Sequence, residues 1–464
     1  MIFADLPNRL PQVSATYTSD NNVYFATSKP YRLDYFFFAG YLVLFSWLVT
    51  KTGFFNKSGL SKSQLVIIFL LKVIAGIFYG WMGHFYGGFA QMIDTWNYHN
   101  NGLAEFHLLQ TNPHQYFTNI FHDPYNKEGV DSFFGSKNSY WNDLKGNVFT
   151  KIVSIFHIFS FGQYYINVIF YAFISLFGPI AIYRVMMDVF PDRKNLLLLA
   201  IFFTPSFFYW SSGIHKEGLI FTGIALIVYH VYYGFKEKRF AIKRWLAILL
   251  GLIILLLLRN FVLVIILPAL FAWLLANKWP KYSLACFSGV YLFCLLCFFG
   301  LRFIDSRLDF PQAVVSKQQA FIENVGKSSV PIKELEPTVL SFVENTPQAI
   351  TLSVIRPYPS DVKHLLSLAA AVETDVLLLI FLLYLLYRRR EKIISKNILY
   401  FCVFFSLTLL LAIGFSVNNL GAIVRYRSIV LPLIIPLIVV QTDWKAIATT
   451  FAGRNKKDFA TTKI

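Results

Sequence analysis

Charged residues are scarce in this sequence, since Asp, Glu, Lys and Arg together make up only 14% of its 464 residues. A soluble globular chain carries about 25% of such residues, so this chain lacks the polar side chains needed to cover a water-facing surface. Hydrophobic residues make up 56% of the sequence. The shortage of charge excludes an ordinary soluble protein, and the 49 Phe and 26 Tyr residues exclude a disordered chain.

Cysteine is also scarce, and all four cysteines lie within apolar runs. Cys294 and Cys297 have CxxC spacing, but no second pair and no neighbouring His completes a zinc motif, so we expect no disulfide and no metal site. Metal-ligand spacing is likewise missing among the scattered histidines His107, His114, His122 and His157. Neither a GxxxxGKS/T loop nor a GxGxxG turn is present, which argues against nucleotide binding. We expect no cofactor; a divalent metal is compatible with the sequence but not indicated by it.

Long apolar runs recur along the chain, separated by charged flanks. Because about 20 apolar residues cross a bilayer as a helix, we interpret these runs as transmembrane helices. They cover residues 33–50, 64–84, 164–183, 196–210, 219–235, 245–258, 261–277, 283–301, 365–387, 398–415 and 429–440. The sequence therefore predicts an all-α polytopic membrane protein with about eleven transmembrane helices, in a single transmembrane domain over residues 1–464.

Basic residues predict the orientation of these helices, because cytoplasmic loops are enriched in Lys and Arg. The basic clusters at residues 236–244, 388–392 and 454–457 fall on one side if residues 245–277 form a hairpin of two spans. A single long span would split these clusters, so the hairpin is favoured, with the N-terminus outside and the C-terminus cytoplasmic. Orientation signals then account for most of the net charge of +17, and we expect no nucleic-acid partner.

Two long polar segments fall on the external side in this arrangement, at residues 85–147 and 302–364. The first is rich in aromatic residues and histidines, so we expect interfacial helices there. The second is more polar and is expected to form a small cap or a mobile loop. The one N-glycosylation sequon, at Asn56, lies on the predicted inner side, which favours a bacterial inner (plasma) membrane over the secretory pathway.

Residues 91–99 (QMIDTWNYH) place an acid just beyond the outer end of a predicted span. Asp94 and Tyr98 are four residues apart and share one face of a helical turn, and His99 lies beside them. A partly desolvated carboxylate gains basicity and can act as a general base on an incoming hydroxyl. An interfacial helix cap with aromatic anchors is the alternative interpretation.

Residues 211–218 (SSGIHKEG) form a short external link between two spans. Lys216 stands at a predicted helix start, on the side where Lys is depleted, which indicates a fixed anion. Glu217 could instead neutralise Lys216 and leave nothing for a ligand. We include His215, which precedes them, among the candidate substrate-binding residues.

Four arginines stand at the external ends of predicted spans, namely Arg259, Arg356, Arg425 and Arg427. Arginine at the edge of hydrocarbon is costly unless it is paired, and its planar fork suits phosphate oxygens. Lipid headgroups could pair with them, as could the carboxylates Asp94, Glu217, Glu373 and Asp375. Their number on the side that is depleted in basic residues favours an anionic ligand, and a phosphate-bearing lipid that enters from the membrane fits best.

Two short elements resemble motifs of the GT-C superfamily of integral-membrane glycosyltransferases, especially the bacterial enzymes that use polyprenyl-phosphate sugars. Residues 94–98 (DTWNY) are similar to the acid-x-x-x-Tyr element that opens the first external loop, and residues 424–432 (VRYRSIVLP) are similar to an Arg-Tyr element followed by Pro at a late span. The resemblance implies that Asp94 is the catalytic base and that Arg425 lies near the lipid phosphate. The arginine-rich outer face also resembles that of O-antigen polymerases and ligases, which join lipid-linked glycans outside the membrane.

These features predict a glycosyltransferase that moves a sugar from a polyprenyl-phosphate donor to a glycan, lipid or protein acceptor with inversion. Asp94 would deprotonate the acceptor, while the phosphate is held by Lys216, Arg259, Arg356 and Arg425. The other candidate substrate-binding residues are Tyr98, His99, His215, Glu217 and Arg427. A flippase or transporter for an anionic lipid or solute is the alternative, although the sequence shows no inverted repeat and no broken-helix pair.

Overall fold

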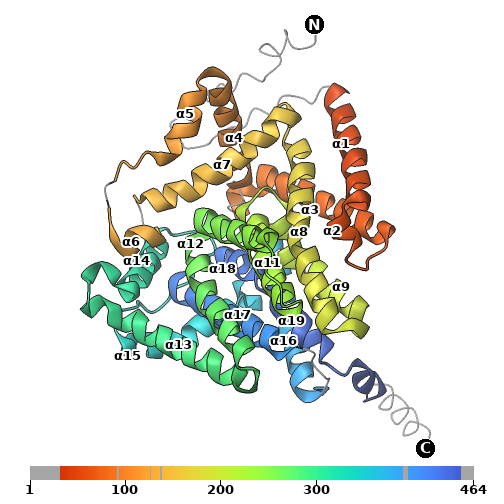
Figure 1. The fold of residues 1–464 in the computed structure, drawn as a ribbon. Coiled ribbons are helices and arrows are strands. Elements are labelled where there is room, and N and C mark those ends of the chain that lie inside the picture. Colours follow the sequence, from red (N-terminus) through yellow and green to blue (C-terminus); the bar gives the residue numbers. More distant parts are fainter. Residues whose placement is uncertain (1–31, 91–93, 126, 136–137, 390–394, 451–464) are drawn as a thin grey trace, which may run out of the picture.

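The computed structural model describes residues 32–90, 94–125, 127–135, 138–389 and 395–450 of the chain. Helices dominate these residues, and no β-strand occurs among them (Figure 1). The basic cluster at residues 454–457 lies outside the described residues, as do most of the cluster at 388–392 and the beginning of the chain. The fold is therefore all-α over the part of the chain that the structure describes.

Within these ranges, eight helices are long and apolar enough to cross a membrane, or up to ten if each of two bent helix pairs is one span. Length and composition of these helices make the protein an integral membrane protein. The eight are α1 (Arg32–Lys51), α3 (Lys62–Ala90), α8 (Tyr164–Val189), α11 (Lys216–Lys236), α12 (Ile242–Lys278), α13 (Ser283–Gly300), α16 (Leu365–Leu386) and α17 (Lys396–Ser416). Short helices beside them are α2 (Gly53–Asn56), η2 (Pro191–Arg193) and η3 (Pro280–Tyr282).

The bent pairs are α9 (Lys194–Phe202) with α10 (Pro205–Ser212), and α18 (Leu420–Ser428) with α19 (Leu431–Val440). The chain bends by 58° in the first pair and by 68° in the second. Pro205 and Pro432 each stand in the first turn after the bend, where a missing N–H is tolerated and the fixed φ suits a new helix. The expectation that the chain contains no broken-helix pair is therefore wrong.

The segment expected to form a hairpin at residues 245–277 lies within one 37-residue helical element, α12. A straight helix of this length would measure about 55 Å, well beyond the roughly 30 Å of a hydrocarbon core. The helix is interrupted at Arg259, whose φ of −160° and ψ of 77° are extended rather than helical. The break lies between the two spans expected at residues 245–258 and 261–277, so α12 consists of two helices that meet at Arg259. The count of eight to ten candidate spans includes α12 once.

Helices α8 and α11 form the centre of the bundle. In their most apolar windows, 78% of the α8 residues and 72% of the α11 residues are buried, against 6% in α1 and 17% in α16. α8 packs against α3 and α11, and α11 also packs against α12. The outer helices therefore turn apolar side chains away from the protein, as contact with lipid requires.

The first polar segment folds into helices that extend from the top of the molecule down its left side in the view of Figure 1. They are α4 (Asp94–Thr111), α5 (Pro113–Thr118), η1 (Asn119–Phe121), α6 (Gly129–Phe134) and α7 (Tyr140–Ser160). α4 packs along α7. Trp96 Nε1 donates a hydrogen bond to the Gly80 carbonyl at 2.8 Å, and the Thr95 and Tyr164 hydroxyls lie 2.6 Å apart. These bonds fix the beginning of α4, and with it Asp94, against α3 and α8.

The second polar segment also contains short helices, and part of it holds the beginning of α18. The helices are η4 (Leu301–Phe303), η5 (Ser306–Leu308), α14 (Phe310–Glu323), α15 (Val339–Ile350), the π-helical turn η6 (Thr351–Ile355) and η7 (Pro359–Asp361). The Leu420 N–H donates to the Ser328 carbonyl at 3.0 Å. The Asn419 side chain caps α18 by accepting from the Ala422 N–H at 3.0 Å. The loop therefore positions the helix that carries Arg425.

Candidate functional site

Five side chains that the sequence analysis selects from separate segments meet in one group: Asp94, His215, Glu217, Arg259 and Arg425. We call this group the charged cluster. Its members come from the first turn of α4, the beginning of α11, the break in α12 and the middle of α18. Asp94 and Arg425 are 331 positions apart in the sequence, so the fold and not local sequence brings them together.

Arg425 joins the two carboxylates of the charged cluster. Its Nη1 donates to Asp94 Oδ2 at 2.9 Å and lies 3.2 Å from His215 Nε2. Its Nε lies 3.6 Å from Glu217 Oε1. The rigid planar fork of arginine allows one side chain to face several acceptors at once.

Glu217 is the buried carboxylate, with only 1% of its side chain exposed. Its Oε2 contacts His215 Nδ1, and its Oε1 accepts from Arg259 Nη2 at 2.8 Å. A buried carboxylate is tolerated when it is paired and hydrogen-bonded, and the first turn of α11 also favours a negative charge. Glu217 therefore holds an imidazole and two guanidinium groups in place.

Asp94 is the accessible carboxylate, with 40% of its side chain exposed. Burial by itself raises the pKa of Asp94, but the nearby His215 ring and the charge of Arg425 outweigh this effect and hold the pKa well below its usual range. Asp94 is therefore ionised at neutral pH. An anion that drew Arg425 away would remove this stabilisation and make the carboxylate a stronger base.

Lys216 and Tyr98 lie beside the charged cluster. Lys216 Nζ stands 5.3 Å from the centre of the Tyr98 ring, a cation–π contact, and the same ring lies 5.6 Å from that of His215. Burial raises the pKa of the Tyr98 hydroxyl above its usual value, so the group stays neutral. The structure thus brings together seven of the ten selected residues.

The other three, His99, Arg356 and Arg427, lie in different surroundings. Arg427 Nη1 donates to the Arg356 carbonyl at 2.6 Å, and its Nη2 contacts the Thr374 hydroxyl. Arg356 Nε lies 3.3 Å from a carboxylate oxygen of Asp361. The His99 ring packs 4.7 Å from that of His157. Over the described ranges, none of the three forms a hydrogen bond or ion pair with the charged cluster.

Two residues near the site were missed by sequence reasoning. The Tyr426 ring lies 4.2 Å from the Arg259 guanidinium carbon and 5.1 Å from that of Arg425. Lys72, buried in α3, donates to the Ser211 carbonyl at 2.6 Å and so holds the end of α10, just before His215. A lysine inside an apolar run is expensive, which is a sequence signal that could have identified Lys72.

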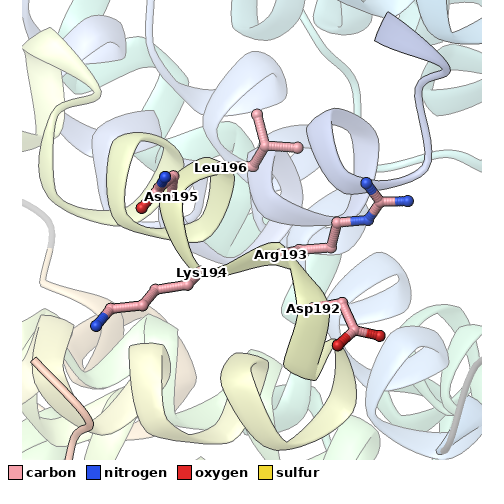
Figure 2. A pocket seen from close by; sticks show the side chains of 5 residues that line it. All are labelled: Asp192, Arg193, Lys194, Asn195 and Leu196. Carbon is pink, nitrogen blue, oxygen red and sulfur yellow. The ribbon is translucent and has the colours of Figure 1, made fainter. Parts of the chain in front are cut away.

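An open hollow at the η2–α9 turn is lined by residues 192–196 (Figure 2). Figure 2 shows the Arg193 and Lys194 side chains pointing in different directions. The hollow follows the end of α8 at Val189, whereas Tyr171, whose hydroxyl contacts the His215 carbonyl, is near the beginning of that helix. About 27 Å of helix separates these two positions, so the hollow is not part of the charged cluster.

Metal-binding geometry is not found in the part of the chain that the structure describes, where no three His, Cys, Asp or Glu residues are arranged to hold an ion. In the charged cluster, both carboxylates face arginines. The arginines of the charged cluster are therefore groups that can bind an anionic ligand.

Comparison of the chain with protein-family models, curated proteins and solved structures finds no match. The candidate function therefore rests on the composition and geometry of the charged cluster.

Proposed function

We propose that the protein is a membrane glycosyltransferase that moves a sugar from a polyprenyl-phosphate donor to a hydroxyl of a glycan, lipid or protein acceptor. The reaction would take place on the external face of a bacterial plasma membrane. The observation that carries the proposal is the accessible carboxylate of Asp94, paired 2.9 Å away with Arg425 in a group of cations. This arrangement supports the proposal because it sets a carboxylate that can accept a proton beside a guanidinium group that can bind phosphate.

The cations support binding of an anionic lipid headgroup. Three basic side chains lie near the two carboxylates of the charged cluster, namely Lys216, Arg259 and Arg425. The ring of Tyr79 lies 6.3 Å from that of His215, and Tyr79 is seven residues before Tyr86, where the apolar part of α3 ends. Seven helical residues span about 10 Å, so the group lies within reach of a lipid that enters from the membrane.

The reaction would be a single inverting displacement. Asp94 takes the proton of the acceptor hydroxyl as its oxygen forms a bond to C1 of the sugar. The bond between C1 and the phosphate oxygen breaks, and its electron pair leaves with the phosphate. Arg259, Arg425 and Lys216 stabilise this charge, and a phosphate that competes for Arg425 also makes Asp94 more basic.

Sugar transfer by the purified full-length protein in nanodiscs, with defined polyprenyl-phosphate sugars and acceptors, tests the proposal. Because general base catalysis typically contributes about 10²- to 10⁴-fold, Asp94→Asn is expected to reduce transfer at least about 100-fold without a change in thermal unfolding. Asp123→Asn, which alters an exposed carboxylate in the same polar segment, is the matched control and should remain active. Full activity of Asp94→Asn would exclude Asp94 as the base.

A flippase or transporter for an anionic lipid is the second candidate, and the broken helices favour it. Transport sites are often built where membrane helices are interrupted. Arg259 lies at the break of α12, and Arg425 belongs to a bent pair. The same preparation separates the candidates, because a transporter would redistribute an unchanged lipid. A polymerase or ligase of the O-antigen type would instead join the donor's glycan to an acceptor chain.

A further inference from the structure

Two lysines meet beside the charged cluster, Lys145 of α7 and Lys317 of α14. Lys145 Nζ donates to the Phe134 carbonyl at 3.2 Å, and Lys317 Nζ donates to the Gly135 carbonyl at 2.8 Å. Lys317 and Gly135 are 182 positions apart, yet α6 and α14 lie side by side (Figure 1). The two polar segments therefore bring two ammonium groups to consecutive carbonyls at the end of α6.

Gly135 makes this approach possible. It ends α6 with a φ of +76°, a conformation that side chains other than Gly rarely adopt. A Cβ atom at this position would lie only 2.7 Å from Lys145 Nζ. The glycine therefore both turns the chain and leaves room for the ammonium group.

The two lysines lie close enough to the charged cluster for their charges to interact with the charges of the cluster. The Asn260 side-chain amide, next to Arg259, donates to the Phe133 carbonyl and so joins α12 to the same end of α6. Burial, together with the positive charges of Lys317, Lys216 and Arg259, lowers the pKa of Lys145 to about 7. Four basic side chains thus share one region between α6, α7, α11, α12 and α14.

Among these four basic side chains, Arg259 is the one that pairs with a carboxylate of the described residues, Glu217 at 2.8 Å. No carboxylate there forms an ion pair with Lys145, Lys216 or Lys317, and the carbonyl end of a helix supplies only about half a negative charge. Arg259 is 7% exposed, and its Nη1 has no hydrogen-bond partner in the same part of the chain. A buried N–H without an acceptor costs free energy, and an oxyanion between these cations would supply that acceptor.

We propose that Lys145 and Lys317 extend the phosphate site of Arg425, Arg259 and Lys216 by a second anion subsite, which shares Arg259 and Lys216 with the first and binds a further phosphate group of the substrates. The inference rests on the proposed function and narrows its substrate class: donor and acceptor together carry two phosphate groups. The second belongs either to a diphosphate of the lipid donor or to a phosphorylated acceptor. Lys145 and Lys317 lie on helices outside the candidate spans, whereas Lys216 and Arg259 lie on the candidate spans α11 and α12.

Binding of inorganic pyrophosphate to the full-length protein in nanodiscs tests the subsite without any need for sugar transfer. The double variant Lys145→Ala/Lys317→Ala is expected to bind pyrophosphate at least about tenfold more weakly, because two charge-assisted hydrogen bonds are lost. Lys145→Arg/Lys317→Arg keeps the charges and should retain most of the affinity. Lys127→Ala, which removes an exposed lysine of the first polar segment, is the matched control. Equal affinity of the wild type and the double alanine variant, or no binding to either, would overturn the proposal.

Competition identifies the source of the second phosphate. Displacement of pyrophosphate by polyprenyl diphosphate, but not by polyprenyl monophosphate, assigns the subsite to the donor. Displacement by a soluble sugar phosphate, but by neither lipid, assigns it to the acceptor, and displacement by none of them overturns the substrate assignment. Lysine-dependent pyrophosphate binding without any transfer would reject the proposed function alone. Unimpaired transfer by the double alanine variant would reject the subsite alone.

Discussion

Arg425 and Arg427 stand two residues apart on α18, yet their side chains enter different surroundings. Arg425 is partly exposed and meets a carboxylate and an imidazole, Asp94 and His215. Arg427 is buried and meets neutral oxygens, the Arg356 carbonyl and a threonine hydroxyl. Residues two apart on a helix face nearly opposite directions, since each residue turns the helix by about 100°. One arginine therefore faces groups that can exchange partners with a ligand, and the other joins segments of the fold.

The side chain of Arg427 joins separate segments of the fold. Arg427 links α18 to the segment after η6 and to Thr374 of α16. The preceding residue of α16, Glu373, accepts the Ser206 N–H at 2.9 Å and so attaches α10 to the same place. An arginine at the end of a predicted span is therefore not in itself evidence for a ligand; the nature of its partners decides.

The largest expected effect is on the rate of sugar transfer, which should depend on Arg425 and not on Arg427. Arg425→Ala removes a cation from the leaving phosphate and is expected to lower kcat/KM for sugar transfer by about 10³-fold, roughly 4 kcal/mol. Thermal unfolding should change little, because Glu217 keeps Arg259 and His215 as partners. Arg425→Lys keeps the positive charge but lacks the planar guanidinium group, so its kcat/KM should lie between those of Arg425→Ala and the wild type. Wild-type transfer rates in Arg425→Ala would remove this arginine from the phosphate site.

The next effect is on stability. Arg427→Met leaves a buried carbonyl and hydroxyl without their charged donor, so the free energy of unfolding is expected to fall by about 2 to 3 kcal/mol. Chemical or thermal unfolding in detergent measures this change. Transfer per folded molecule should stay within about threefold of the wild type, since no contact with substrate is removed. A large loss of transfer at unchanged stability would erase the distinction between the two arginines.

A smaller effect concerns His157, which packs against the buried His99 and, like Arg427, lies outside the charged cluster. Burial lowers the pKa of His157 from 6.5 to about 4. Because the folded protein favours the neutral ring, the contribution of His157 to the free energy of unfolding is complete above pH 6.5. This contribution is lost as the pH falls toward 4, and the loss amounts to about 2 kcal/mol at pH 5. His157→Gln should therefore lose less stability than the wild type between pH 8 and pH 5 in unfolding measurements. Identical losses would show that His157 does not titrate in this way.

Much of the helical framework could be predicted from sequence because long apolar runs have few alternatives in a membrane. The break at Arg259 falls where the distribution of basic residues predicted a turn, but the bend before Pro205 could not be located in this way. It lies within residues 196–210, an apolar run that reads as continuous. Hydrophobicity reports the length of a run but is insensitive to one non-helical residue inside it.

The charged cluster was partly predictable for an electrostatic reason. Arg259 and Arg425 stand out because basic residues are depleted on the predicted external side, and Asp94 stands out at a helix start. Lys145 and Lys317 could not be grouped with them, because each lies in a polar segment where a lysine is unremarkable. Their convergence depends on the packing of α6 against α14, which no local pattern encodes.

The position of the phosphate in a structure of the protein bound to polyprenyl phosphate tests the role of the charged cluster most directly. We expect phosphate oxygens within about 3 Å of guanidinium nitrogens of Arg425 and Arg259, the distance of charge-assisted hydrogen bonds. Asp94 should then be separated from Arg425 and open to an acceptor. A phosphate bound elsewhere, with Arg425 still paired to Asp94, would contradict the proposed function.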